Sequence, residues 1–203
     1  HVCLSKGYSL QNGQVIRVTE MNTANKKVYL VSNGDFRDAA CEICWPQQKE
    51  VLTGVEKAFA KLGYESEILP EYDAGRKHGF VNMQCGGTKI FSRIAPDAPV
   101  VIVLSCWAYA HHVASGLQTH KGPILLLANF DGTWPGLVAL LNHSATLSRL
   151  CVTHSRIWSE TFDDELFMER LQAWCESGSI EYDESHLTDA GQLTISEEAQ
   201  RFG

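Results

Sequence analysis

The chain has 203 residues, of which 44% are hydrophobic and 20% charged, and its formal net charge is -7. This is the composition of a globular protein with one large domain, or one domain with extra tails. The acidic balance and the lack of a Lys/Arg cluster argue against a nucleic-acid partner. The longest apolar runs are of strand length and the first residues carry no signal pattern, so we expect no membrane association and a cytoplasmic location.

The cysteines point to free thiols rather than to a disulfide framework. Their number is odd and the chain is not small, which favours a reducing compartment. Cys41 and Cys44 form a lone CxxC, but several residues separate it from the preceding strand, and no second CxxC completes a zinc site. We expect a structural role for this pair and keep a thiol redox module as a weaker alternative. The seven positions are Cys3, Cys41, Cys44, Cys85, Cys106, Cys151 and Cys175.

The first part of the chain stands apart from the regular pattern that follows. Residues 10–16 suggest a hairpin around Asn12-Gly13. Met21 and its polar lead-in look like a natural start, so residues 1–26 are predicted to be an N-terminal extension outside the domain.

From residue 27 the chain alternates between apolar strands and amphipathic helices. Residues 27–32 predict a strand, 33–45 a loop, and Pro46 the first turn of a helix that ends at Gly63. Residues 65–69 predict a second strand. A short helix is expected near residues 87–94, stopped by Pro96.

The second half continues the same alternation. Strands are predicted at residues 99–105, 123–129 and 151–158, and helices at 109–117 and 134–150. Asp163 or Asp164 can cap a last helix, and Gly178 can end it. Residues 181–203 are acidic and polar, and they predict an exit segment or a linker toward a further domain.

This alternation predicts a three-layer αβα fold with a flavodoxin-like parallel sheet of about five strands in the order 2-1-3-4-5, over residues 27–180. Ligands of such sheets bind beyond the carboxyl ends of the strands, at the point where the strand order reverses. Here that point lies between the first and third strands. The segments 33–37 and 105–107 should flank it.

Candidate binding residues follow these strands directly. Trp107 and Trp134 come after two buried strands, and each offers an apolar face that could stack on a sugar; the alternative is that both pack as core. Arg37 could donate hydrogen bonds to vicinal hydroxyls or to an anion. The alternative for Arg37 is a surface salt bridge with Asp35 or Asp38.

Recognised catalytic machinery is missing from the sequence. His111 and His112 are neighbours on a predicted helix start, which does not make a two-ligand metal site, and the other histidines are scattered. There is no GxSxG, Walker A or GxGxxG motif. Ser105 and Cys106 could be nucleophiles, but no base accompanies them. The sequence therefore predicts only part of a functional site.

Six motifs in one order resemble the N-terminal region of the L-fucose isomerase-like family, which has the L-arabinose isomerases as more distant members. The similarity covers roughly residues 28–180. The Cys-Trp-x-Tyr and Gly-Thr-x-Pro-Gly elements are its most specific parts. The motifs are residues 33–37 (NGDFR), 44–47 (CWPQ), 78–80 (HGF), 105–109 (SCWAY), 121–125 (KGPIL) and 129–136 (NFDGTWPG).

The resemblance implies a three-domain aldose–ketose isomerase with a manganese-type ion, held by two carboxylates and a histidine of the other two domains. This chain would be the first, substrate-capping domain, inactive alone, in a homo-oligomer where it reaches over a neighbour's active site. By the same resemblance Trp107 covers the sugar substrate and Arg37 touches its hydroxyls. Tyr109 and Asn129 are further candidate substrate-binding residues.

The resemblance assigns no catalytic residue, metal ligand or cofactor to this chain. Trp134, also a candidate, stands where fucose isomerases proper often carry a charged residue, which leaves the sugar open. The alternative function is a self-contained flavodoxin-like module that binds a small polar ligand or a protein at the same edge.

Overall fold

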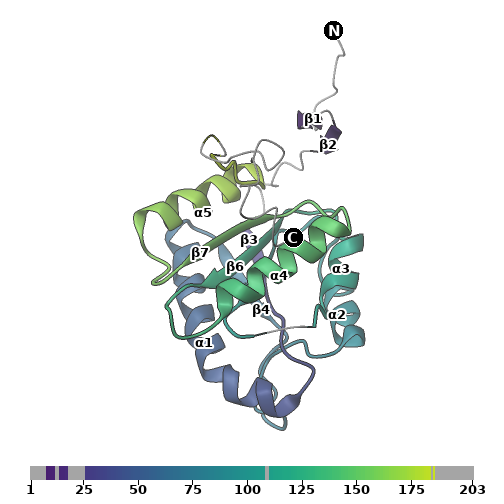
Figure 1. The fold of residues 1–203 in the computed structure, drawn as a ribbon, viewed down its shortest axis with the longest axis vertical. Coiled ribbons are helices and arrows are strands. Elements are labelled where there is room, and N and C mark those ends of the chain that lie inside the picture. Colours follow the sequence, from purple (N-terminus) through teal and green to yellow (C-terminus); the bar gives the residue numbers. More distant parts are fainter. Residues whose placement is uncertain (1–7, 12–13, 18–25, 108–109, 184, 186–203) are drawn as a thin grey trace, which may run out of the picture.

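The centre of the molecule is a five-stranded parallel sheet (Figure 1). The structure is a computed structural model that describes residues 8–11, 14–17, 26–107, 110–183 and 185. The sheet order is β4-β3-β5-β6-β7, which is 2-1-3-4-5 in chain order and confirms the flavodoxin-like prediction. Its strands are β3 (Lys27–Ser32), β4 (Glu65–Leu69), β5 (Val100–Leu104), β6 (Ile124–Asn129) and β7 (Ser155–Ser159).

Helices cover both faces of the sheet and make three layers (Figure 1). Helices α1 (Asp38–Lys61) and α5 (Glu165–Ser177) pack on one face. Helices α2 (Gln84–Phe91), α3 (Ala114–Thr119) and α4 (Gly136–Arg149) pack on the other. Alternate residues of β5 and β6 point into the two layers, so both strands must be apolar throughout.

The prediction of a loop over residues 33–45 is wrong, because α1 already begins at Asp38. Pro46 lies inside the helix rather than in its first turn. A proline removes one helical hydrogen bond, here the one to the carbonyl of Glu42. Glu42 is exposed, so water can replace that bond. The early start places Cys41 and Cys44 on the helix.

Tertiary hydrogen bonds make α3 begin later in the chain than predicted. The helix was expected from residue 109 but begins at Ala114, so His111 and His112 precede it. The side chain of Asn33, at the end of β3, donates to the carbonyl of Ala110 (2.8 Å) and accepts from the backbone N–H of Val113 (3.3 Å). These bonds take backbone groups that a longer helix would use.

The start of β7 is also later than expected, at Ser155 rather than at residue 151. After α4, the N–H of Cys151 donates to Ser148 (3.1 Å) and that of Val152 to Leu147 (2.9 Å), which closes the helix end. These residues therefore belong to the helix terminus. Helices α2 and α4 occupy the predicted segments with bounds shifted by two or three residues at their starts.

The predicted caps of α5 are confirmed. The carboxylate of Asp164 accepts a hydrogen bond from the N–H of Phe167 at 2.9 Å, and Gly178 takes a left-handed conformation with φ of 75°. Both devices satisfy backbone groups that a helix end leaves unpaired.

The hairpin near the N-terminus is confirmed in its strands. Strands β1 (Tyr8–Gln11) and β2 (Gln14–Arg17) pair antiparallel, with Gln11 opposite Gln14. Residues 12–13, the expected turn, lie outside the described residues, as do residues 186–203 of the expected exit segment. The division at residues 27 and 180 stays a prediction.

Where it is described, the chain beyond α5 returns to the sheet edge. The hydroxyl of Tyr182 accepts from the N–H of Arg156 (2.6 Å) and donates to its carbonyl (2.8 Å). This contact covers backbone groups of the edge strand β7. Among the described residues, no helix has the length and apolar character needed to cross a membrane.

Candidate functional site

A shallow, open depression of about 350 Å³ lies at the carboxyl edge of the sheet, beside the predicted switch point between β3 and β5. A smaller and more enclosed inner cavity of about 10 Å³ shares Asp35, Ala40, Cys44 and Trp107 with it. The expectation that segments 33–37 and 105–107 flank one crevice is therefore met. The depression is lined by Asp35, Arg37, Ala40, Cys44 and Trp107.

Asp35 and Arg37, which both line the depression, form a two-pronged ion pair. The Nε of Arg37 donates to one carboxylate oxygen at 2.7 Å and Nη2 to the other at 2.9 Å. The Asp35 side chain is only 5% exposed and that of Arg37 is 59% exposed. Hydrogen bonding to the guanidinium holds the pKa of Asp35 below its usual value.

The ion pair with Asp35 is one of the alternatives that the sequence left open for Arg37. It does not by itself prevent ligand binding, because the Arg37 side chain remains 59% exposed. The rigid, bidentate geometry fixes where the cation stands at the edge of the depression.

Trp107 lies in the same depression, with 43% of its surface exposed. A buried core residue would not remain so accessible, so the structure disagrees with the core alternative for this side chain. Trp107 follows β5 and Arg37 follows β3, so the parallel sheet brings together two residues that are far apart in the sequence.

Asn129, the last residue of β6, and Trp134 of the following loop belong to a separate cluster. The backbone N–H of Trp134 donates to the carboxylate of Asp131 (2.9 Å), and the side-chain amide of Asn129 donates to its other oxygen (2.9 Å). Trp134 is half-buried and is not among the residues that line the depression. Tyr109 lies outside the described residues.

Asp131 organises that loop. Burial raises its pKa, but hydrogen bonds from the backbone of Trp134 and Thr133 and from Asn129 outweigh this and lower it. Gln47 of α1 also donates to Asp131, at 3.3 Å. The loop after β6 is thereby tied to the helix that carries Cys44.

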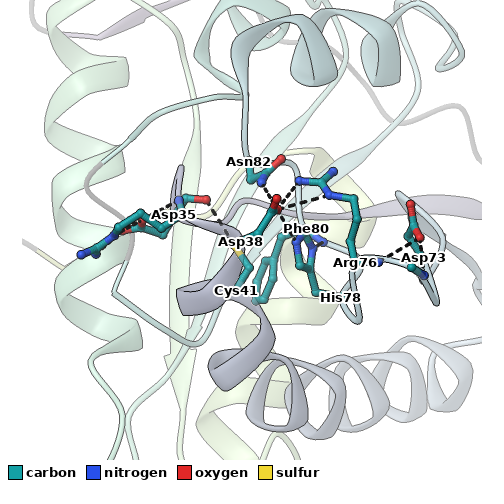
Figure 2. A network of polar contacts seen from close by, with 10 residues as sticks. Asp35, Asp38, Cys41, Asp73, Arg76, His78, Phe80 and Asn82 are labelled. Atoms are coloured by element: carbon teal, nitrogen blue, oxygen red, sulfur yellow. Dashed lines mark hydrogen bonds and ion pairs between the residues drawn. The ribbon is translucent and has the colours of Figure 1, made fainter.

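A second polar network anchors the start of α1 (Figure 2). One carboxylate oxygen of Asp38 accepts from Arg76, from Nε2 of His78 (3.1 Å) and from the amide of Asn82 (2.7 Å). The N–H of Phe80 donates to Nδ1 of His78, so Nε2 carries the proton that His78 donates to Asp38. Sequence reasoning missed this network because its members lie on a predicted loop.

Buried side chains support the floor of the site. Gln48 of α1 donates from Nε2 to the carbonyl of Val103 (3.0 Å) and to the hydroxyl of Ser32 (2.9 Å). Its Oε1 accepts from both the hydroxyl and the N–H of Ser105. One glutamine thus links the ends of β3 and β5.

The thiols differ sharply in their surroundings. Burial raises the pKa of Cys41 to about 11, and its Sγ donates to the carbonyl of Asp35 at 3.1 Å. A hydrogen bond from Cys106 lowers the pKa of Cys44, whereas that contact and burial raise the pKa of Cys106. Sequence reasoning paired Cys44 with Cys41; the fold brings it to Cys106.

In the part of the chain that the structure describes, no three His, Cys, Asp or Glu side chains are grouped so that they could hold a metal ion. These residues therefore supply no ligand set for a manganese-type ion, whose ligands the family resemblance assigns to the other two domains. The site offers instead an aromatic face, a fixed guanidinium and a thiol.

The fold and the site define a flavodoxin-like α/β protein with a small-molecule-sized depression at the switch point of its sheet. A scan of protein-family models matches nothing, and neither a curated protein nor a solved structure is found to be similar.

Proposed function

We propose that this chain is the first, substrate-capping domain of a metal-dependent aldose–ketose isomerase of the fucose/arabinose isomerase type, and that it is inactive alone. The observation that carries the proposal is the joint position of Trp107 and Arg37 in one open depression at the sheet switch point. The sequence motifs after β3, β5 and β6 support the same family.

The two residues suit complementary parts of a sugar. The exposed face of Trp107 is apolar and can stack on the C–H side of a pyranose or an open-chain aldose. The guanidinium of Arg37, fixed by Asp35, can donate to neighbouring hydroxyls. Neither residue moves a proton, so the proposal gives them binding and orientation only.

The rest of the catalytic apparatus is proposed to come from residues beyond those described. The described residues do not fit a divalent ion, so no catalytic step is assigned to them. The proposal includes a cytoplasmic homo-oligomer in which this domain covers a site built by other domains.

Exposed aromatic side chains at the same edge of the sheet favour an edge that another domain or a partner covers. Phe36 after β3 is 64% exposed and Phe130 after β6 is 55% exposed. This also supports the alternative, a self-contained module that binds a partner at this edge. Catalysis separates the two, because only the isomerase interconverts aldoses and ketoses.

The test is conversion of a panel of aldoses, including L-fucose and L-arabinose, by the natural full-length protein loaded with Mn²⁺. Trp107→Ala should raise KM and lower kcat, with kcat/KM reduced roughly tenfold, because about 1.4 kcal/mol of stacking is lost. Metal content should not change. Trp158→Ala is the matched control, since Trp158 is similarly exposed, at 38%, but lies on the edge strand β7. No conversion of any aldose, or unaltered kinetics in Trp107→Ala, would contradict the proposal.

A further inference from the structure

Two cysteines that are distant in sequence meet beside the depression. Cys44 belongs to α1, and Cys106 follows β5. The Sγ of Cys106 lies 3.5 Å from the carbonyl oxygen of Cys44, which brings the two residues into direct contact. Both line the small inner cavity, while Cys44 alone of the two also lines the open depression.

The neighbouring hydrogen bonds decide which thiol keeps its proton. Gln48 donates from Nε2 to a carbonyl, so its Oε1 must accept the hydroxyl proton of Ser105. Ser105 then has no proton left for Cys106, whose Sγ lies 3.2 Å from its hydroxyl oxygen, so Ser105 can only accept in that contact. The other neighbour of Cys106, the carbonyl of Cys44, can only accept. Cys106 is held as a buried thiol, and Cys44 is the thiol better placed to ionise.

Cys41 does not take part in this pair. It is buried and its thiol donates to the carbonyl of Asp35 at 3.1 Å, which keeps it protonated. It lines the inner cavity but not the open depression. The CxxC motif is therefore not the reactive pair, although it supplies one member.

We propose that Cys44 is an oxidisable thiol that reacts with small hydroperoxides entering the depression, and that Cys106 resolves it as a Cys44–Cys106 disulfide. The depression is open to solvent, while the inner cavity has room for about one water molecule, so small oxidants are favoured over bulky disulfides.

The chemistry proceeds in two steps. The Cys44 thiolate attacks the terminal oxygen of the hydroperoxide; an S–O bond forms, the O–O bond breaks, and the alkoxide leaves and takes up a proton as an alcohol. The sulfur of Cys106 then attacks the sulfenic sulfur of Cys44. The S–S bond forms, the S–O bond breaks, and hydroxide leaves with the Cys106 proton as water. Two thiols are oxidised and one hydroperoxide is reduced.

The test is peptide mapping of the full chain after reduction, brief treatment with tert-butyl hydroperoxide, and alkylation of the remaining thiols. We expect a cross-linked peptide pair joining Cys44 to Cys106 with the loss of two hydrogens, which disappears on treatment with dithiothreitol. Cys85 and Cys151 are exposed and serve as internal references that should remain alkylated.

Variants separate the two roles. Cys106→Ser should trap Cys44 as a sulfenic acid that dimedone labels, Cys44→Ser should abolish both label and cross-link, and Cys41→Ser should leave the cross-link intact. Oxidation of Cys85 or Cys151 before Cys44 would overturn the proposal. So would a Cys41–Cys44 cross-link, or the absence of any Cys44–Cys106 product in the unmodified chain.

Discussion

Acidification should destabilise the protein most strongly through a buried histidine on α4, whose pKa is lowered to about 4. His143 is 1% exposed, and its Nδ1 lies 2.9 Å from the carbonyl of Ala139. A carbonyl only accepts, so Nδ1 carries the proton of the neutral ring. Its Nε2 is buried and has no hydrogen-bond partner among the described residues. Protonation at Nε2 would bury a cation with an unsatisfied N–H.

Neighbouring rings add to this cost. The ring centroids of His111 and His143 lie 4.5 Å apart. Electrostatic interactions with His111 and His112 both disfavour a positive charge on His143. Burial, with these contributions, lowers the pKa of His143 from 6.5 to about 4. The unfolded chain therefore binds a proton at a higher pH than the folded chain does. The contribution to stability is complete above pH 6.5 and is lost as the pH falls toward 4.

The size of this destabilisation follows from the shift in the pKa of His143. Each pKa unit corresponds to about 1.4 kcal/mol, so the free energy of unfolding should fall by about 3 kcal/mol over this window from His143 alone. Carboxylates with lowered pKa values, such as Asp35 and Asp131, lose their contribution only at lower pH. The histidine effect is thus separable from the general acid response.

Urea unfolding between pH 7.5 and pH 4, followed by circular dichroism, measures this dependence; the pH limits are roughly those of the histidine window. His143→Gln removes the titrating group and should flatten the curve by as much as about 1.4 kcal/mol per pH unit. Asn142→Gln changes the exposed neighbour on the same helix and should keep the slope of the unmodified protein. If His143→Gln keeps that slope too, the assignment of the acid response to His143 is wrong.

Two further predictions concern packing. Gly87→Ala should destabilise the chain by about 1–3 kcal/mol, because the new Cβ would lie 2.0 Å from the carbonyl oxygen of His112, whereas Gly86→Ala meets nothing closer than 3.5 Å and should be neutral or stabilising. Thermal unfolding of the two variants checks this, and equal melting temperatures would contradict it. Gln48→Leu should cost roughly 2–4 kcal/mol in urea unfolding, since it removes the donor to the buried Ser32 hydroxyl and the acceptor of the Ser105 hydroxyl proton. A loss below about 1 kcal/mol would show that water replaces the amide.

Much of the fold could be predicted because its signals are local. The apolar runs of β5 and β6, the acidic cap at Asp164 and the glycine at position 178 each act within a few residues of chain. The start of α1 could not be predicted in this way. Pro46 is the normal mark of a helix start, and only the tertiary network around Asp38 shows that the helix begins earlier.

The candidate site was predicted only in part, for the same reason. The position of segments 33–37 and 105–107 follows from strand order, so Arg37 and Trp107 could be placed in one depression. Trp134 was expected beside them because it also follows a buried strand, but it does not line the depression. Strand order fixes which loops are neighbours, not which way their side chains point.

The sequence by itself determined the layers, the strand order and the edge where a ligand would bind, because hydrophobic periodicity and right-handed crossovers leave few alternatives. Only the tertiary structure decided that Cys44 lies beside Cys106, 62 residues away, and that the thiol of Cys41 donates to Asp35 instead. Hydrogen bonding and burial depend on distances across the folded chain. Residue spacing along the sequence does not contain those distances.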